Sequence, residues 1–215
     1  MRFGTALKWS TATATVKIFT KFPEAVDVIG HEMTHGVTQN ASALIYQGEP
    51  GALNEHLSDV FGSLIKQRLK GQDAASASWL IGESVIIAPD PLQAGQVCRG
   101  VRDLLHPGTA YVNLAFGSDP QPDCYANLNK DPADNFGVHI NSGIPNRAFA
   151  MYAIAIGGNA WDIAGKVWYQ AATASGLPAK ATFSQFRATT LATAQAMAST
   201  TVPALIAAWN AVGVM

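Results

Sequence analysis

The stretch that most constrains the fold of this chain is VIGHEMTHGVTQ, residues 28–39. Residues four apart share one face of an α-helix, so His31 and His35 can both present an imidazole nitrogen to one metal ion. Glu32 then lies beside the metal without binding it. Two histidines at this spacing with an adjacent glutamate are typical of a zinc-peptidase helix, although two ordinary helical histidines are the alternative. The pattern predicts a zinc-binding helix over residues 23–38.

The following stretch, GALNEHLSD, offers a third zinc ligand. A catalytic zinc ion takes three protein ligands and keeps one position open. Glu55 stands twenty residues after His35, which is far enough for the chain to turn back and place a second helix against the first. Asp59 follows one helical turn later, where a carboxylate can accept the free N–H of a ligating histidine. We expect this helix to follow a turn at residues 48–51 and to end at Gly71.

Composition and charge exclude several classes of function. The chain has 215 residues, of which 48% are apolar, so it can bury a sizeable core. Its net charge is −1 with scattered basic residues, which argues against a nucleic-acid partner or a membrane partner. The start of the chain lacks the pattern of a secretory signal. The spacing of Cys98 and Cys124 leaves a disulfide open, with two free thiols as the alternative.

The rest of the sequence predicts a mainly α-helical protein with a short β-rich start. The run TATATVKIF predicts one or two strands within residues 1–22. Residues 86–140 carry six prolines among many Gly, Asp and Asn, which predicts a long irregular segment with a functional role. From Pro145 onward, Ala-rich patterns predict four helices in an orthogonal bundle. Thr182 and Gln185 have the spacing of a capping box that opens one of them.

Several stretches together resemble the thermolysin family of secreted bacterial metallopeptidases. They are DVIGHEMTHGVTQ, LIYQGEPGALNEHLSDVFG, WLIGESV and DNFGVHINSGIPNRAF, followed by the closing FSQFRATTLATAQ and WNAVGV. The resemblance covers about residues 17–215 and is closest to the short protealysin-like branch. It implies a thermolysin-like helical zinc-peptidase domain at residues 23–215, preceded by a remnant of the family's N-terminal β-rich domain at residues 1–22. It also implies secretion.

The resemblance assigns catalytic roles to individual residues. It implies one zinc ion held by His31, His35 and Glu55, with Asp59 orienting His31 and Asn54 orienting His35. It implies catalysis by Glu32 as general base and by Tyr46 and His139 as donors to the oxyanion, with Asp134 orienting His139. From the residues alone, Tyr46 would be interpreted as a core aromatic and His139 as a loop histidine.

The resemblance also implies a binding site for peptide or protein substrates. Arg102 matches an arginine that grips a substrate carbonyl, although Arg99 nearby leaves the alignment open. The residues matching the pocket after the scissile bond are all apolar, namely Phe19, Phe22, Val28, Ile81, Val85 and Val101. Such a pocket favours cleavage on the N-terminal side of bulky apolar residues. Ordinary core packing is the alternative for some of these six side chains.

Two positions depart from the family pattern. At the family's calcium site Asp27 and Glu83 remain, but Lys66 stands in place of another acidic ligand. An ammonium group can neutralise two carboxylates, so we expect Lys66 to substitute for calcium and this site to bind no calcium ion. His56 stands where the family has a small residue, and we expect it to bind no metal because it points around the helix from Glu55.

The largest departure is at the N-terminus, where the family has a β-rich domain that forms one wall of the cleft. Two functions follow from this. The chain is either a zinc endopeptidase, or a catalytically weak or inactive zinc-binding remnant that needs a complementary N-terminal domain. An exopeptidase is less expected because no amine-anchoring carboxylate motif is visible. An apolar face left uncovered by the missing domain would favour self-association.

Overall fold

The computed structural model describes residues 8–11, 14–17, 24–85, 95–114, 117–173 and 176–215. The helices are α1 (Val26–Ala41), α2 (Gly48–Lys70), α3 (Ala133–Asn141), α4 (Gly143–Ile156), α5 (Ile163–Thr173), α6 (Phe183–Met197) and α7 (Val202–Ala211), with 3-10 turns at Tyr125–Asn127 and Ser199–Thr201. The mainly helical architecture expected from the sequence is confirmed. Among the helices of the described residues, none is long and apolar enough to cross a membrane.

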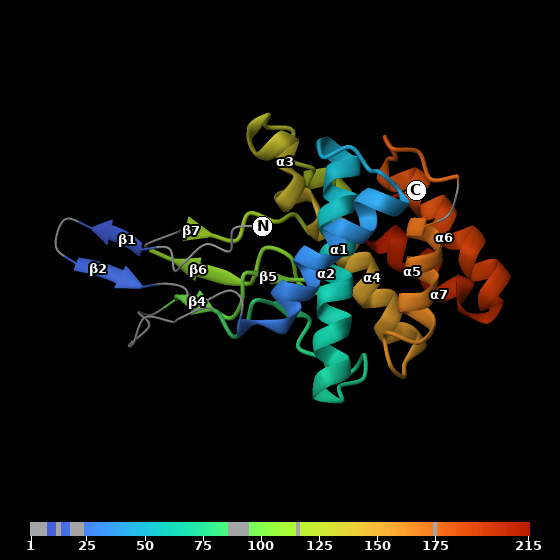
Figure 1. Cartoon of the computed structure of the whole chain (residues 1–215), viewed down its shortest axis with the longest axis horizontal. Helices are drawn as coiled ribbons and strands as arrows, with labels where there is room; N and C mark the ends of the chain where they lie inside the picture. Colours follow the sequence, from blue (N-terminus) through green and yellow to red (C-terminus); the bar gives the residue numbers. More distant parts are fainter. Residues whose placement is uncertain (1–7, 12–13, 18–23, 86–94, 115–116, 174–175) are drawn as a thin grey trace.

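The strands are short and pair in three small antiparallel sheets. They are β1 (Lys8–Thr11), β2 (Ala14–Lys17), β3 (Leu80–Ile81), β4 (Val97–Cys98), β5 (Arg102–Asp103), β6 (Tyr111–Asn113) and β7 (Gly117–Ser118). β1 pairs with β2, β3 with β5, and β4 with β6 and then β7. The segment expected to be irregular therefore holds several two- and three-residue strands, while residues 86–94 lie outside the described part. Figure 1 shows α2 between these short strands and helices α4 to α7.

Helix α1 runs from Val26 to Ala41 and is displaced by three residues at each end from the prediction. The turn expected at residues 48–51 is wrong, because these residues form the first turn of α2. Pro50 is tolerated there since the first N–H groups of a helix have no intrahelical partner. The Glu49 carboxylate suits the positive end of the helix. Gly71 ends α2 in the left-handed conformation, at φ 63°, and this end was predicted correctly.

The hydrophobic core is centred on Trp168 of α5. Its ring stacks on that of Trp209 at a centroid distance of 6.0 Å and on that of Tyr152 at 5.7 Å. Phe149 and Phe186 meet the same ring edge-on at 4.9 and 6.1 Å. These five side chains are fully buried and come from α4, α5, α6 and α7. The aromatic cluster thus joins the four C-terminal helices into one unit.

The four helices expected after Pro145 are present as α4 to α7 in the described part of the chain. The capping box predicted before α6 is also confirmed. The Thr182 side chain accepts from the backbone N–H of Gln185 at 3.2 Å, and the Gln185 side chain accepts from the backbone N–H of Thr182 at 2.9 Å. Two N–H groups that have no partner within the helix are satisfied in this way.

Helices α1 and α2 pack antiparallel and unusually close together. A Cβ atom at Gly62 would clash with the carbonyl oxygen of Asp27, and one at Gly30 would lie 2.8 Å from Cδ1 of Ile65. Because a side chain at Gly62 would clash with backbone, glycine at this position allows the two helices to approach until side chains further along reach across. The close approach of the two helices brings Glu55 to the histidines of α1.

Candidate metal centre

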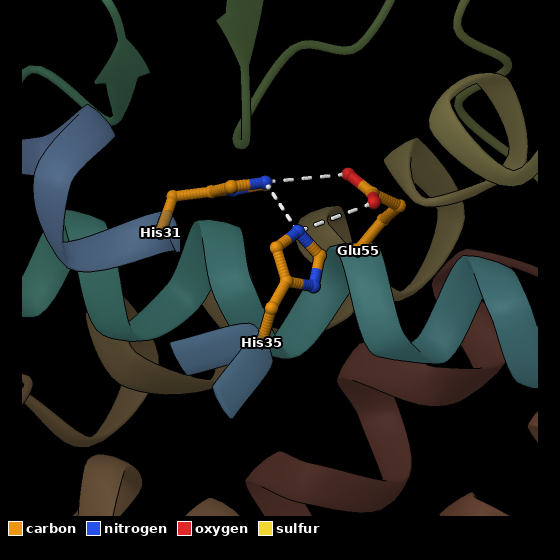
Figure 2. Close-up of side chains that lie close together, drawn as sticks. All are labelled: His31, His35 and Glu55. Atoms are coloured by element: carbon orange, nitrogen blue, oxygen red, sulfur yellow. Dashed lines mark hydrogen bonds and ion pairs between the residues drawn. The ribbon is translucent and has the colours of Figure 1, made fainter. Parts of the chain in front are cut away.

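Three side chains predicted to bind zinc meet at one point between α1 and α2. His31 and His35 lie on one face of α1 and point toward Glu55 of α2 (Figure 2). The two Nε2 atoms are 3.1 Å apart, and each lies 3.4 Å from a different oxygen of the Glu55 carboxylate. His31 and Glu55 are buried, whereas His35 is half-buried. The cluster is therefore open on the side of His35.

The geometry of this cluster fits a tetrahedral zinc ion. Ligand atoms held about 2.0–2.2 Å from such an ion lie roughly 3.3–3.6 Å apart, close to the distances between these three groups. Oε2 of Glu55 is buried and accepts no hydrogen bond from any described residue. A buried carboxylate oxygen without a donor is costly unless a cation satisfies it. His56 lies outside this group of three, and its Nδ1 instead lies 2.7 Å from Oδ1 of Asn146.

His31 is oriented by Asp59, as expected. Oδ1 of Asp59 lies 2.9 Å from Nδ1 of His31, which turns Nε2 toward the metal position. Arg102 donates two hydrogen bonds to the same carboxylate, from Nε at 2.8 Å and from Nη2 at 2.6 Å. Arg99 instead donates to Asp103 at 2.9 Å. The structure therefore brings Arg102, and not Arg99, to the metal centre.

His35 is oriented by two residues of α2, of which only one was predicted. Oδ1 of Asn54 lies 2.7 Å from Nδ1 of His35, as expected for an orienting residue. Oγ of Ser58 lies 3.1 Å from the same nitrogen. Ser58 follows Asn54 by four residues and so lies on the same face of the helix, which is the sequence signal that could have identified it.

The charges of the site stabilise one another despite their burial. Burial alone raises the pKa of Glu55, but the hydrogen bond of His31 and the nearby positive charges outweigh it and lower the pKa to about 2. Burial likewise opposes ionisation of Asp59, and Arg102 and His31 hold its pKa well below the usual range. Burial lowers the pKa of His31, but these two carboxylates raise it by more, so that it rises to about 9. A metal ion that binds His31 must therefore displace a proton.

Tyr46 and His139 approach the cluster from the far side of Glu55. The Tyr46 hydroxyl donates a short hydrogen bond to Oε1 of Glu55 and lies 3.2 Å from Nε2 of His139. Burial and the Glu55 carboxylate hold the pKa of Tyr46 well above its usual range, so the phenol keeps its proton. Nε2 of His139 lies 3.5 Å from Oε2 of Glu55. The Tyr46 hydroxyl and the His139 imidazole thus lie together beside the metal position.

His139 is held by a short left-handed turn at the start of α3. Residues 134–137 all have positive φ, between 50° and 73°, which is rare for residues other than glycine. The turn brings Asp134 back over the helix, where Oδ1 lies 2.6 Å from Nδ1 of His139 and Oδ2 accepts from its backbone N–H at 2.9 Å. Gln121 donates to the carbonyl oxygen of His139 at 2.7 Å. The strained backbone of residues 134–137 therefore helps to fix the orientation of the His139 imidazole.

A cavity of about 170 Å³ opens beside the metal cluster. Its lining combines polar and apolar side chains, namely His31, Glu32, Arg102, His139, Val28, Ile81 and Val101. Three of the six residues expected to form an apolar pocket are therefore in it. Val85 is fully buried. Its side chain and that of Val101 both lie close to Gly82, so Val85 packs behind the wall of the cavity. Phe19 and Phe22 lie outside the described residues.

The expected calcium site holds a buried lysine. Nζ of Lys66 lies 3.2 Å from Oδ2 of Asp27 and 3.9 Å from Oε2 of Glu83, and it donates to the carbonyl oxygen of Leu80. Lys66 and Asp27 are 4% and 2% exposed, so this ion pair is shielded from water. The same Asp27 oxygen accepts from the backbone N–H of Gly82 at 3.0 Å. The ammonium group thus joins α1, α2 and the loop after β3.

A helix pair that presents two histidines and a glutamate, with a second glutamate in the adjoining cavity, is typical of the helical domain of a zinc peptidase. Residues 42–214 match the family model described as the thermolysin metallopeptidase, alpha-helical domain. This chain belongs to the thermolysin metallopeptidase family, and the resemblance read from the sequence is confirmed.

Several relatives support this membership. An extracellular metalloprotease of Pectobacterium carotovorum subsp. carotovorum is 45% identical over 199 residues, covering 92% of this chain and 56% of the relative. Protease PrtS of Photorhabdus sp. is 41% identical, covering 92% and 53%. The solved structure of the precursor of protealysin, a metalloproteinase from Serratia proteamaculans, superposes with a TM-score of 0.85 at 45% identity, covering 92% of this chain and 60% of that one. The chain spans about half the length of the curated relatives it matches.

The two partners of His35 should differ in their effect on zinc binding. Replacing Asn54 with Leu should lower zinc affinity about tenfold, because the imidazole loses its shorter hydrogen bond. Ser58→Ala should lower it less than about threefold, since one N–H cannot bond fully to both oxygens. Competition with a chromophoric chelator measures both affinities. Equal losses in the two variants would contradict this division of roles.

The buried lysine should matter far more to stability than its exposed neighbour. Lys66→Met should lower the free energy of unfolding by about 3–5 kcal/mol, because it leaves Asp27 charged and unpaired in the interior. Lys70 lies 3.9 Å from the same Glu83 but its side chain is 55% exposed, so Lys70→Met should cost less than about 1 kcal/mol. Urea unfolding of both variants tests the contrast. Similar losses at the two positions would show that the Lys66 ion pair is unimportant.

Proposed function

We propose that this chain is a zinc-dependent endopeptidase domain, with its catalytic part at residues 23–215, that cleaves on the N-terminal side of bulky apolar residues. The observation that carries this proposal is the single cavity in which Glu32, His139 and Arg102 meet an apolar wall beside the zinc cluster. A purely structural zinc site needs four protein ligands and no such cavity. Three ligands with a glutamate beside them suit hydrolysis.

The catalytic base in this proposal is Glu32. A bound zinc ion supplies Lewis acidity, which makes water nucleophilic near neutral pH and polarises a peptide carbonyl. Glu32 takes the proton from the attacking water and then passes it to the leaving amine. Its place on α1 next to His31, in the wall of the cavity, supports this role.

The donors that receive the developing negative charge are Tyr46 and His139. A carbonyl oxygen that becomes an oxyanion is stabilised by donors already aimed at it, which typically contributes about 3–4 kcal/mol per donor. The closeness of the Tyr46 hydroxyl to Nε2 of His139 supports their joint action. Asp134 holds the imidazole in orientation through Nδ1.

Substrate selectivity in this proposal comes from Arg102 and the apolar wall. Arg102 is held rigidly by Asp59 and lines the cavity, so its remaining N–H can donate to a substrate carbonyl oxygen. Val28, Ile81 and Val101 supply the wall against which a bulky apolar side chain packs. Burying one such side chain is worth about 1.5–3 kcal/mol.

Two further features belong to the same proposal. We infer that the protein is secreted, because two similar proteases are named extracellular, one of them the extracellular minor metalloprotease of Serratia marcescens. We also infer that Lys66 takes the place of a calcium ion. Its distances to Asp27 and Glu83 support this, since a cation already neutralises both carboxylates. Addition of calcium should therefore not raise the unfolding temperature of the parent chain.

Removal of the base should abolish turnover without removing the metal. Glu32→Gln should lower kcat by at least about 10²- to 10⁴-fold on an internally quenched peptide with Leu or Phe after the scissile bond. Zinc content, measured on the same sample, should stay at that of the parent. Glu24→Gln is the matched control and should retain activity.

Two results would count against the proposal. If the parent binds zinc but is as inert as Glu32→Gln, the chain is a zinc-binding domain that needs a complementary N-terminal domain to form a working cleft. If Glu32→Gln retains turnover, a different group is the base.

Filling the cavity should change selectivity. Val101→Phe should lower kcat/KM about tenfold or more for a peptide with Phe after the scissile bond, but little for one with Ala, because the added ring occupies the space of the larger side chain. Val112→Phe introduces the same ring on the exposed strand β6 and should leave the ratio of the two rates unchanged. A parallel fall for both peptides in Val101→Phe would indicate that the cavity does not select the substrate.

A further inference from the structure

A buried chain of hydrogen bonds joins the aromatic core to the metal centre. Nε1 of Trp168 donates to Nε2 of His56 at 2.7 Å, and Nδ1 of His56 lies 2.7 Å from Oδ1 of Asn146. Nδ2 of Asn146 donates to Oδ2 of Asp59 at 2.9 Å, and the other oxygen of Asp59 orients the ligand His31. The chain crosses α5, α2, α4 and α1. The sequence predicted only the last of these links, between Asp59 and His31.

The direction of every link follows from the chemistry of the groups. An indole N–H can only donate, so Nε2 of His56 accepts and the ring proton of His56 is on Nδ1. That N–H then donates to Oδ1 of Asn146, which leaves the amide nitrogen of Asn146 facing Asp59. A carboxylate can only accept. All three hydrogen bonds, from Trp168 to His56, from His56 to Asn146 and from Asn146 to Asp59, can therefore form only in this one orientation of the imidazole and the amide.

Burial makes these hydrogen bonds difficult to replace. His56, Asn146, Asp59 and Trp168 all have 0% exposure, so water cannot replace a lost partner. Oδ2 of Asp59 accepts from Arg102 and Asn146, and Oδ1 accepts from His31 and Arg102. Each oxygen thus has two donors, and the loss of one allows the carboxylate to rotate away from the ligand.

We propose that His56 is a positioning residue of the metal centre, which acts through Asn146 and Asp59 to hold His31 in its ligating orientation. This inference rests on the proposed zinc site. His56 also occupies the position where the family resemblance implies a small residue, so the resemblance assigns it no role. The same ring packs edge-on against Phe186 at a centroid distance of 6.0 Å, which anchors it to α6.

The test compares His56→Leu, which fills the space without hydrogen bonds, with His56→Gln, whose amide can both accept and donate. The control is Gln67→Leu, which removes an equally buried polar group from α2 whose hydrogen bond to Ser63 stays within that helix. Imidazole ¹H–¹⁵N spectra of the metal-free chain report on His31 directly. Chelator competition then gives zinc affinity, and the Co²⁺ absorption spectrum reports on ligand geometry. Thermal unfolding checks that each variant is folded.

The relay predicts that His56→Leu shifts or broadens the His31 signals and lowers zinc affinity about tenfold, with an altered Co²⁺ spectrum. His56→Gln should restore both, and Gln67→Leu should change neither. If His56→Leu does not fold, Trp168→Phe removes the first donor together with part of the buried ring, and where thermal unfolding shows that it is folded it should also disturb the His31 signals. Unchanged His31 signals, or changed signals with parental zinc affinity, would overturn the positioning role. A parent chain that binds no zinc would instead overturn the proposed metal centre, and the imidazole spectra would still decide whether the relay exists.

Discussion

The close contact of α1 with α2 is the constraint on which the metal centre depends. Gly30 and Gly62 allow the two backbones to approach, and a Cβ atom at Gly62 would clash with the carbonyl oxygen of Asp27. Each turn of α2 then contributes a partner to α1. Near one end of the contact Lys66 reaches Asp27, in the middle Asp59 reaches His31, and further along Asn54 reaches His35. A wider separation would lose all three interactions together.

This contact also explains how so much charge is tolerated in the interior. Desolvating an ion costs several kcal/mol unless its partners are fixed and its remaining hydrogen-bonding positions are filled. Asp59 is completely buried and meets this requirement with four hydrogen bonds from three residues. Glu55 meets it only in part, because one buried oxygen has no hydrogen-bond donor among the described residues. This oxygen, Oε2 of Glu55, faces the position where a metal ion would bind.

The sequence was most informative where the information is local. The spacing of His31 and His35 and the helix that follows were sufficient to predict that these two side chains and Glu55 meet, because a helix converts spacing directly into a shared face. The family resemblance supplied the pairing of Asp134 with His139, which depends on a left-handed turn that few sequences adopt. Local signals failed at residues 48–51, where Gly and Pro indicated a turn but stand at a helix start, a position that tolerates both.

Other parts of the site could not be predicted from the sequence, because they depend on contacts between distant segments. Asn146 and Trp168 stand 87 and 112 residues from their partners Asp59 and His56. The choice between Arg99 and Arg102 also required the structure, since both lie in one short loop and β-strand segment. In the structure Arg102 bonds to Asp59 of α2, whereas Arg99 bonds to Asp103 of β5.

The asymmetry of the two histidines argues for chemistry at the metal rather than a structural ion. The side chain of His31 is 8% exposed, whereas that of His35 is 27% exposed. A structural zinc ion is enclosed by four protein ligands, but the described residues bring only three to this cluster. The cluster borders, on the side of His31, a cavity that Glu32, Arg102 and His139 also line. A three-ligand metal site beside such a cavity suits the proposed hydrolysis better than an enclosed structural ion would.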